Sequence, residues 1–264
     1  MKQIVLPGTD LEVSSLCLGA GPIGSAVDQG ESYRLLDAFL DHGGNFVDSA
    51  LVYANWLPIE KSISEKTIGR WMKLRGNRGR VVVGTKGAHP DLAAMHVSRL
   101  SPGEIVGDLE ASLRHLQTDR IDLYWLHRDD PHRPAGEIVE TLNGQVIAGK
   151  VRWFGCSNWR APRIREAQAY AAGHGLRGFV ADQMMWSAAV VDPQAIADRT
   201  IVVMDDSLRQ LHRSLPGCGG RFRQAVEGGQ AVPGEPLHNC CRGGRELRSA
   251  RPPKTGAPAA NPDG

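Results

Sequence analysis

The stretch IDLYWLH at residues 121–127 is followed by a helical pattern at 134–148 and then by VRWFGCSN at residues 151–158. Both apolar runs are short and rich in aromatic and β-branched residues, which is typical of buried strands. The residues between them suffice for one returning helix, so we expect the two strands to run parallel. Residues 121–158 therefore predict a strand–helix–strand unit of an α/β protein.

Three further apolar runs end in a polar residue in the same way, at Asp48, Lys86 and Gln183. Together with His127 and Ser157, these ends lie 26 to 41 residues apart, the length of a strand plus a returning helix. Parallel strands linked in this way can close into a barrel, and barrels carry their chemistry at the C-terminal ends of the strands. We therefore predict a TIM (β/α)8-type barrel in residues 1–213, with strands at 45–48, 81–85, 121–126, 151–155 and 179–182.

Apolar residues recur at helical spacing between these strands. The predicted helices are 31–42, 64–74, 101–116, 134–148 and 162–172. Gly43 and Gly44 end the first helix, and Ser101 with Glu104 is typical of a capping box at the start of the third. Residues 2–18 precede the barrel and are predicted as a β-hairpin with a turn at Pro7–Asp10.

Residues 214–264 have a different composition, with 17 Gly or Pro among 51 positions. Such a segment cannot bury enough apolar surface to offset its ordering entropy, so we expect a disordered tail. The barrel would then be incomplete, lacking about two or three of the eight strands. The tail is either natural or the product of a reading-frame shift in a GC-rich gene; the interruption of the barrel at this point favours the frame shift.

Composition narrows the class of protein. A chain of 264 residues can form one TIM-type barrel or two smaller domains, and 41% apolar residues are enough for a large core. A net charge of +2 argues against a nucleic-acid partner, and no apolar run reaches the ~18 residues that a membrane span needs. An early turn at Pro7-Gly8 leaves no room for a signal peptide, so we expect a cytoplasmic protein.

The five cysteines lack regular spacing, which argues against a disulfide framework or a zinc site. Cys17 and Cys156 are predicted to lie in the core.

Four polar residues at the predicted strand ends are suited to carbonyl reduction: Asp48, Tyr53, Lys86 and His127. Reduction needs a proton donor at the carbonyl oxygen, and a tyrosine becomes a better acid when a nearby ammonium stabilises its phenolate. Lys86 would supply that ammonium, with Asp48 holding it in place. His127 would hydrogen-bond the carbonyl oxygen or relay a proton.

Taken together, the motifs resemble those of the aldo-keto reductase superfamily. They cover residues 2–213 in the family's order and comprise Leu16-Cys-Leu-Gly19-Ala-Gly21, Asn45-Phe-Val-Asp48-Ser-Ala-x-x-Tyr53, Gly84-Thr-Lys86, Asp122-Leu-Tyr-Trp-Leu-His127, Gly149-Lys-Val-Arg-Trp-Phe-Gly155-x-Ser157-Asn158 and Gln183-Met-Met-Trp186. The resemblance implies a TIM barrel, a nicotinamide cofactor (usually NADPH) and an aldehyde or ketone substrate. By position, Tyr53 would be the acid, Asp48 and Lys86 would tune it, and His127 would orient the carbonyl.

The same resemblance implies a cofactor site. Ser157, Asn158 and Gln183 would hold the nicotinamide carboxamide, Trp186 would stack on the nicotinamide ring, and Gly21 would lie in a loop at the barrel mouth. Family members continue with further strands and a basic loop that binds the cofactor's phosphates. Residues 214–264 do not match that pattern, so we expect this chain to bind NADPH weakly or not at all.

Several alternatives compete with this interpretation. Gly19-Ala-Gly21-Pro-Ile-Gly24 matches a dinucleotide-binding fingerprint, but that fingerprint needs a helix opening at its third glycine. A metal site at His127–His132 is disfavoured because Asp129, Asp130 and His132 are expected to be solvated. A metal-dependent barrel hydrolase fits Lys86 and Tyr53 poorly, whereas a non-catalytic remnant or regulatory binding module stays open. Residues expected to shape the substrate pocket are Trp56, Trp125 and Arg128.

Overall fold

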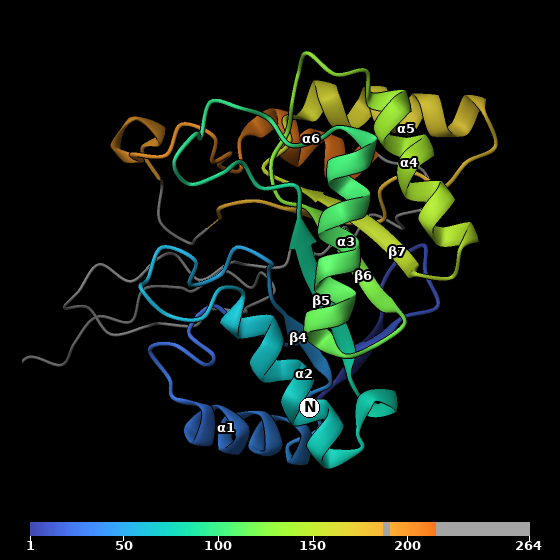
Figure 1. The fold of residues 1–264 in the computed structure, drawn as a ribbon. Helices are drawn as coiled ribbons and strands as arrows, with labels where there is room; N and C mark the ends of the chain where they lie inside the picture. The colour runs from blue at the N-terminus through green and yellow to red at the C-terminus, as the bar shows by residue number, and fades with distance from the viewer. Residues whose placement is uncertain (187–190, 215–264) are drawn as a thin grey trace, which may run out of the picture.

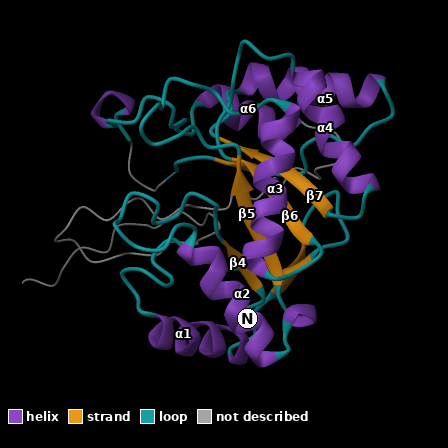
Figure 2. Ribbon diagram, in the orientation of Figure 1, coloured by secondary structure: helices purple, strands orange, loops and turns teal. Residues whose placement is uncertain are grey.

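The computed structural model describes residues 1–186 and 191–214, which form a parallel sheet covered by helices (Figures 1 and 2). Six strands pair in the order β3-β4-β5-β6-β7-β8, and every neighbouring pair is parallel. A separate antiparallel hairpin, β1–β2, precedes the sheet. The predicted α/β fold of the barrel type is confirmed, with the described strands forming a curled half-barrel.

The elements alternate along the chain as the motifs predict. The strands are β1 (Gln3–Val5), β2 (Glu12–Ser14), β3 (Cys17–Gly19), β4 (Phe46–Asp48), β5 (Val82–Gly87), β6 (Ile121–Leu126), β7 (Val151–Ser157) and β8 (Asp182–Gln183). The helices are α1 (Gln29–Asp41), α2 (Ile63–Arg75), α3 (Pro102–Leu116), α4 (Ala135–Ile147), α5 (Ala161–Gly173) and α6 (Asp206–Ser214), with short 3-10 helices at Arg78–Arg80 and Pro193–Ala195. None of the helices in the described chain is long and apolar enough to cross a membrane.

Local sequence signals set the helix starts. The side chain of Ser101 accepts from the Glu104 amide, and the Glu104 carboxylate accepts in return from the Ser101 amide, which completes the predicted capping box. Helix α1 begins at Gln29 rather than Glu31, because Asp28 is its N-cap and accepts from the Glu31 amide at 2.9 Å.

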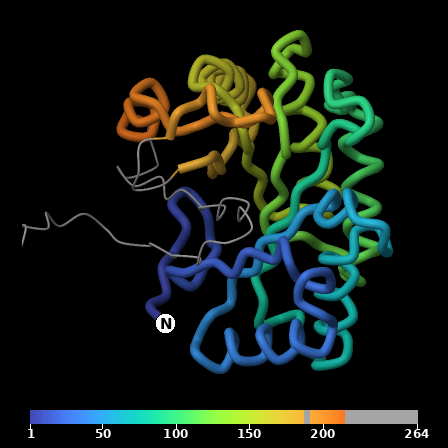
Figure 3. Tube along the Cα trace, turned by 90° about the vertical axis from the view of Figure 1, so that its left-hand side faces the viewer, coloured from blue at the N-terminus to red at the C-terminus, as the bar shows by residue number. Residues whose placement is uncertain are grey.

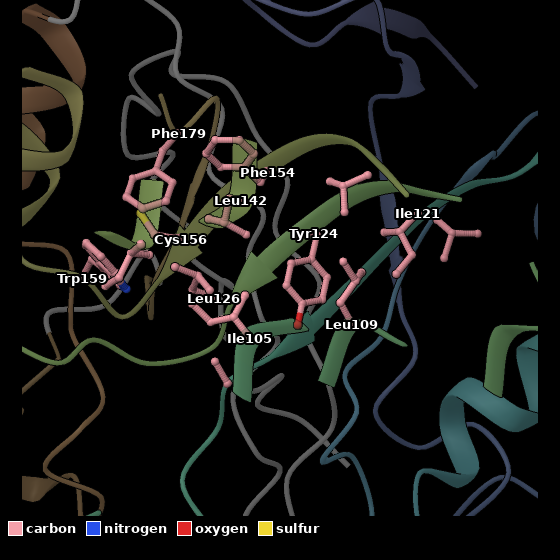
Figure 4. Packing of buried hydrophobic residues seen from close by; sticks show 14 of the residues in the cluster. Ile105, Leu109, Ile121, Tyr124, Leu126, Leu142, Phe154, Cys156, Trp159 and Phe179 are labelled. Atoms are coloured by element: carbon pink, nitrogen blue, oxygen red, sulfur yellow. The ribbon is translucent and has the colours of Figure 1, made fainter. Parts of the chain in front are cut away.

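Side chains alternate between the two faces of the sheet. The outer face packs against the helices and includes Tyr124, Leu126, Phe154 and Cys156 (Figure 4). The inner face carries a second cluster in which Phe46, Leu123, Trp125 and Ala181 meet Leu6, Leu11 and Val13 of the hairpin segment. The hairpin therefore covers the apolar part of the inner face. The polar ends of the strands lie farther along that face.

The predicted hairpin at 2–18 is too long. It ends at Ser14, and Cys17–Gly19 is instead the first strand of the parallel sheet, paired with Phe46–Asp48. Asn45 causes this change of partner, since its side chain accepts from the Ser14 amide at 2.6 Å and its own amide donates to the Ser14 hydroxyl at 3.1 Å. The strand at Asp48 is therefore the second of the sheet, not the first.

The predicted start of the second helix at Ser64 is also wrong. Ser62 occupies the N-cap with a left-handed φ of 55°, and its side chain donates to the Leu51 carbonyl rather than capping the helix. Ser64 lies buried in the first turn, where its hydroxyl is 2.6 Å from the Ala20 carbonyl oxygen and 2.8 Å from the Ser49 hydroxyl. These bonds tie α2 to the ends of β3 and β4.

The ladder continues beyond β8, which is shorter than the predicted strand at 179–182. Met185 forms a parallel bridge with Val203, accepting from the Met204 amide and donating to the Val202 carbonyl, both at 3.0 Å. In Figure 3 the segment leading to α6 lies at the opposite end of the molecule from the N-terminus. Ser214 ends α6, and the rest of the predicted disordered tail at 214–264 lies outside the described residues.

Candidate active site

Lys86 lies at the centre of the candidate site and is fully buried. Its Nζ is 2.6 Å from Asp48 Oδ2, 2.9 Å from the Ser49 carbonyl oxygen and 2.8 Å from the Tyr53 hydroxyl oxygen. An ammonium has three hydrogens to donate, and these three acceptors match them. Asp48, Tyr53 and Lys86, which are far apart in the sequence, therefore meet at one charged group.

The backbone explains why these side chains converge. Asp48 and Lys86 sit on the inner face of neighbouring strands, β4 and β5. The loop that carries Tyr53 is held by hydrogen bonds from the Leu51 amide to the Lys86 carbonyl (2.9 Å) and from the Tyr53 amide to the Ala50 carbonyl (3.1 Å). Gly84 leaves room, because a Cβ there would lie 2.9 Å from Asp48 Oδ1.

His127 follows β6 and joins the group from the next strand. Its amide donates to the Gly87 carbonyl at 2.9 Å, and its ring lies edge-on to Tyr53 with the ring centres 6.1 Å apart. Burial lowers the pKa of His127 well below its ordinary 6.5, and the electrostatic effects of Arg128, Lys86 and His89 act in the same direction. The imidazole is therefore neutral near pH 7.

Gln183 reaches the same group from β8. Its Nε2 lies 3.1 Å from Asp48 Oδ2. A carboxylate accepts only, so this contact fixes which end of the amide is nitrogen. Its Oε1 is buried and has no hydrogen-bond partner within residues 1–186 and 191–214. A buried acceptor of this kind suits an N–H donor from a bound molecule.

Ser157 and Asn158 are buried at the end of β7. The Asn158 amide nitrogen donates to the His127 carbonyl (3.2 Å) and to the Ser157 hydroxyl (3.0 Å), and its oxygen accepts from the Val202 amide at 3.0 Å. Both amide hydrogens are thus used inside the protein. The Ser157 hydroxyl oxygen accepts in its bond with Asn158, so that bond does not use the hydroxyl hydrogen.

The two remaining predicted site residues lie at the rim. Gly21 is the second residue after β3, whose last residue, Gly19, pairs with Asp48. Trp186 lies three residues beyond Gln183 and exposes 37% of its surface. Figure 1 shows the strands β4 to β7 that bring most of the site residues to one end of the sheet.

Three expectations for other residues were wrong. Asp129 was expected to be solvated, but its carboxylate pairs with Arg163 at 3.3 Å in a mostly covered position. Trp125, expected to line the substrate pocket, is buried in the inner cluster. Cys17, expected in the core, is only partly covered.

Arg128 also has a different role from the expected pocket residue. It is 8% exposed and ties the end of β6 to the segment after β8, donating to Thr200 Oγ1 at 2.7 Å and to Asp198 Oδ2 at 3.0 Å.

The dinucleotide-fingerprint alternative is wrong, because it needs a helix that opens at Gly24, whereas α1 begins five residues later. The described chain also contains no group of three or more His, Cys, Asp or Glu that could hold a metal ion.

The residue that the sequence analysis missed is His89. Its ring centre is 4.8 Å from that of His127. A histidine three positions after the strand-end lysine was the signal in the sequence.

Comparison with known proteins places this arrangement in a family. A sequence profile described as the Aldo/keto reductase family matches residues 15–202. Norsolorinic acid reductase B of Dothistroma septosporum is 35% identical over 199 residues, which cover 70% of this chain and 49% of that protein. The chain belongs to the aldo/keto reductase family, as its motifs predict.

Other relatives agree. The uncharacterized oxidoreductase YrpG of Bacillus subtilis is 36% identical over 192 residues, covering 71% of this chain and 58% of that protein. A thermostable aldo-keto reductase, Tm1743, solved with the inhibitor epalrestat, gives a TM-score of 0.62 at 23% identity, over 81% of this chain and 69% of that chain, and so supports the fold. This chain spans about half the length of the curated relatives it matches.

Proposed function

We propose that this chain carries the catalytic half of an NADPH-dependent reductase that converts small aldehydes or ketones to alcohols in the cytoplasm. The observation that supports it most is the buried Lys86 ammonium, which contacts the Asp48 carboxylate and the Tyr53 hydroxyl at once. Carbonyl reduction requires a proton donor at the oxygen and a hydride donor at the carbon. The Lys86 centre is suited to the first requirement.

In this proposal Tyr53 is the acid. Its oxygen accepts from Lys86, so its own hydrogen is directed to another acceptor, the substrate's carbonyl oxygen. The ammonium stabilises the phenolate left behind, and Asp48 keeps the ammonium in place. His127, neutral because of its burial, donates a ring N–H to the same carbonyl oxygen.

The cofactor requirement is supported by the buried atoms at the end of β8. NADPH supplies the hydride when bound. Gln183 Oε1, which has no partner among the described residues, fits an N–H of the nicotinamide carboxamide, and Ser157 has a hydroxyl hydrogen to donate to the carboxamide oxygen. Asn158 fits less well, since its nitrogen is already used twice, and only the second lone pair of its oxygen remains. Trp186 and Gly21 would flank the nicotinamide ring at the rim.

A second candidate is a binding module, or an inactive remnant of the reductase fold. One observation favours it: the internal bonding of Asn158, whose two amide hydrogens are both used inside the protein. This candidate predicts that the Lys86 centre persists without turnover.

A paired experiment separates the two candidates. NADPH fluorescence is titrated with this chain and with a chimera in which residues after 213 are replaced by the corresponding half of a relative, and turnover of an aromatic aldehyde is followed in both. We expect weak or no binding by this chain, and both binding and reduction by the chimera. A chimera that binds NADPH but reduces nothing would overturn the reductase proposal in favour of the binding module.

A further inference from the structure

His89 packs against the ring of His127 from the loop that follows β5. The ring centres are 4.8 Å apart, and the planes meet at 69°, an edge-to-face arrangement. Both side chains are largely covered, with 8% of His89 and 4% of His127 exposed. The contact brings a second imidazole beside the one that the proposed function assigns to the carbonyl.

The ring of His89 is held in place by a hydrogen bond. Its Nδ1 lies 2.7 Å from the Pro90 carbonyl oxygen. A carbonyl only accepts, so Nδ1 carries a hydrogen and donates it to the backbone. The adjoining backbone is fixed too, since the Ala88 amide donates to Asp108 Oδ2 at 2.8 Å, and Arg99 bonds the other oxygen of that carboxylate at 2.7 Å.

His89, but not His127, also lines a cleft. This cleft, of about 420 Å³, lies between the loops after β4 and β5 and is lined by Leu51, Asn55, Lys61, His89, Asp91 and Arg99. His89 is therefore in contact with the cleft on one side and with the His127 ring on the other.

The charges around His127 favour its neutral form. Lys86 and Arg128 are cations nearby, Tyr53 faces the ring edge-on, and Asn158 occupies the His127 carbonyl. Burial is the largest cause of the lowered pKa of His127, so whatever keeps water away from the ring sustains that pKa.

We propose that His89 is a positioning residue that shields the ring of His127 from the cleft and holds it in one orientation. The catalytic meaning of this role rests on the proposed function, because only a neutral His127 with a fixed N–H can serve the carbonyl as described. The shielding itself is a property of the folded chain, with or without cofactor.

The test uses NMR of the protein labelled with ¹⁵N in its histidine rings, without cofactor or substrate. We expect His127 to titrate well below 6.5 as one tautomer in the wild type. In His89→Ala, its pKa should rise by about 1 and the ring should exchange between tautomers. In His89→Phe, which keeps an aromatic ring at the site, the wild-type pKa should be retained. His42→Ala, an exposed change on α1's C-cap, is the control.

Two results would overturn the proposal: an unchanged His127 titration and tautomer in His89→Ala, or equal shifts in His89→Ala and His89→Phe. If His89→Ala does not fold, His89→Asn removes the ring with a smaller loss of volume and carries the same expectations. The readout does not depend on turnover. A failed reductase assay together with a shifted His127 titration would thus refute the proposed function and leave the shielding role intact.

Discussion

Lys86 and Tyr53 share a hydrogen bond of 2.8 Å in which the ammonium donates and the phenol oxygen accepts. The direction is set by chemistry, since an ammonium offers only hydrogens. Lys86 also lies 4.7 Å from the centre of the Tyr53 ring, so the charge is close to the whole phenol. A tyrosine whose oxygen is already accepting from a cation is prepared to donate its own proton and to become a phenolate.

The first prediction concerns that proton. Tyr53→Phe should lower carbonyl reduction by about 100- to 10,000-fold, the usual contribution of a general acid, while leaving NADPH affinity unchanged. The measurement is steady-state reduction and a fluorescence titration in the NADPH-binding chimera. Tyr33→Phe, on α1, is the matched control and should behave as the wild type. Substantial turnover by Tyr53→Phe would remove Tyr53 from the proposed role.

The second prediction concerns the buried charge. Lys86→Met leaves the buried Asp48 carboxylate without its ion pair, which commonly costs about 3–5 kcal/mol in the free energy of unfolding. The double variant Asp48→Asn, Lys86→Met removes both charges and should recover most of that loss. Urea unfolding of the wild type, of Lys86→Met and of the double variant measures the three free energies of unfolding. A double variant as unstable as Lys86→Met would show that the pair is not energetically coupled.

The same Lys86→Met change should alter the pH dependence of reduction in the chimera. Without the ammonium the phenolate loses its stabilising neighbour, and the pH–rate profile should move upward by about 1–3 pH units. An unchanged profile with activity retained would exclude Lys86 as the group that tunes Tyr53.

The third prediction concerns Asp182, on the outer face of β8. Burial raises the pKa of its carboxyl to about 6, partly offset by His212 on α6 at 3.4 Å and by the Cys156 thiol at 3.7 Å. The folded state thus holds this proton more tightly than the unfolded state does. The stability that Asp182 contributes is complete below its unfolded pKa of 3.8 and is lost as the pH rises through about 6.

Asp182→Asn should therefore stabilise the protein at pH 7.5 relative to the wild type, by on the order of 3 kcal/mol, and much less at pH 4. Denaturant unfolding of both proteins at the two pH values gives the difference. Asp206→Asn, at the exposed start of α6, controls for the loss of one negative charge. A pH-independent difference would contradict the raised pKa.

The fourth prediction concerns Gly155 in β7. A Cβ at this position would lie 2.5 Å from the Ala181 carbonyl oxygen and 2.7 Å from the Trp125 ring. Gly155→Ala should destabilise the protein by about 1–3 kcal/mol, because backbone and a buried ring must shift. Gly107→Ala, in α3 with open space around it, should stabilise by about 0.5–1 kcal/mol. Thermal unfolding of both variants checks the contrast, and equal melting temperatures would refute it.

The sequence predicted which side chains converge better than it predicted the edges of the fold. Asp48, Lys86 and His127 each follow a clear apolar run, and the alternation of parallel strands brings such ends together. Cys17–Gly19 escaped prediction because three residues carry too little periodicity to separate a strand from the end of a hairpin. Its identity depends on the tertiary bonds of Asn45.

Other features were unpredictable for the same reason, that they depend on contacts distant in sequence. Arg128 is held by Asp198 and Thr200, about 70 residues away, and Ile201–Met204 becomes a ladder segment only by pairing with Met185. His89 was visible in the sequence, but its contact with His127 depends on how two loops meet. Predictions for 214–264 beyond Ser214 stay predictions.

The bond between Val202 and Asn158 has a consequence for measuring motion. The Val202 amide donates to the Asn158 oxygen at 3.0 Å, and the Asn158 nitrogen donates to the His127 carbonyl at 3.2 Å. The hydrogen of the Val202 amide can exchange with deuterium only when this link between the end of β7 and the 198–204 segment opens. The exchange rate of this one amide therefore reports how often the ends of the strands open. It can be measured without cofactor or substrate, at a position 44 residues from Asn158 in the sequence.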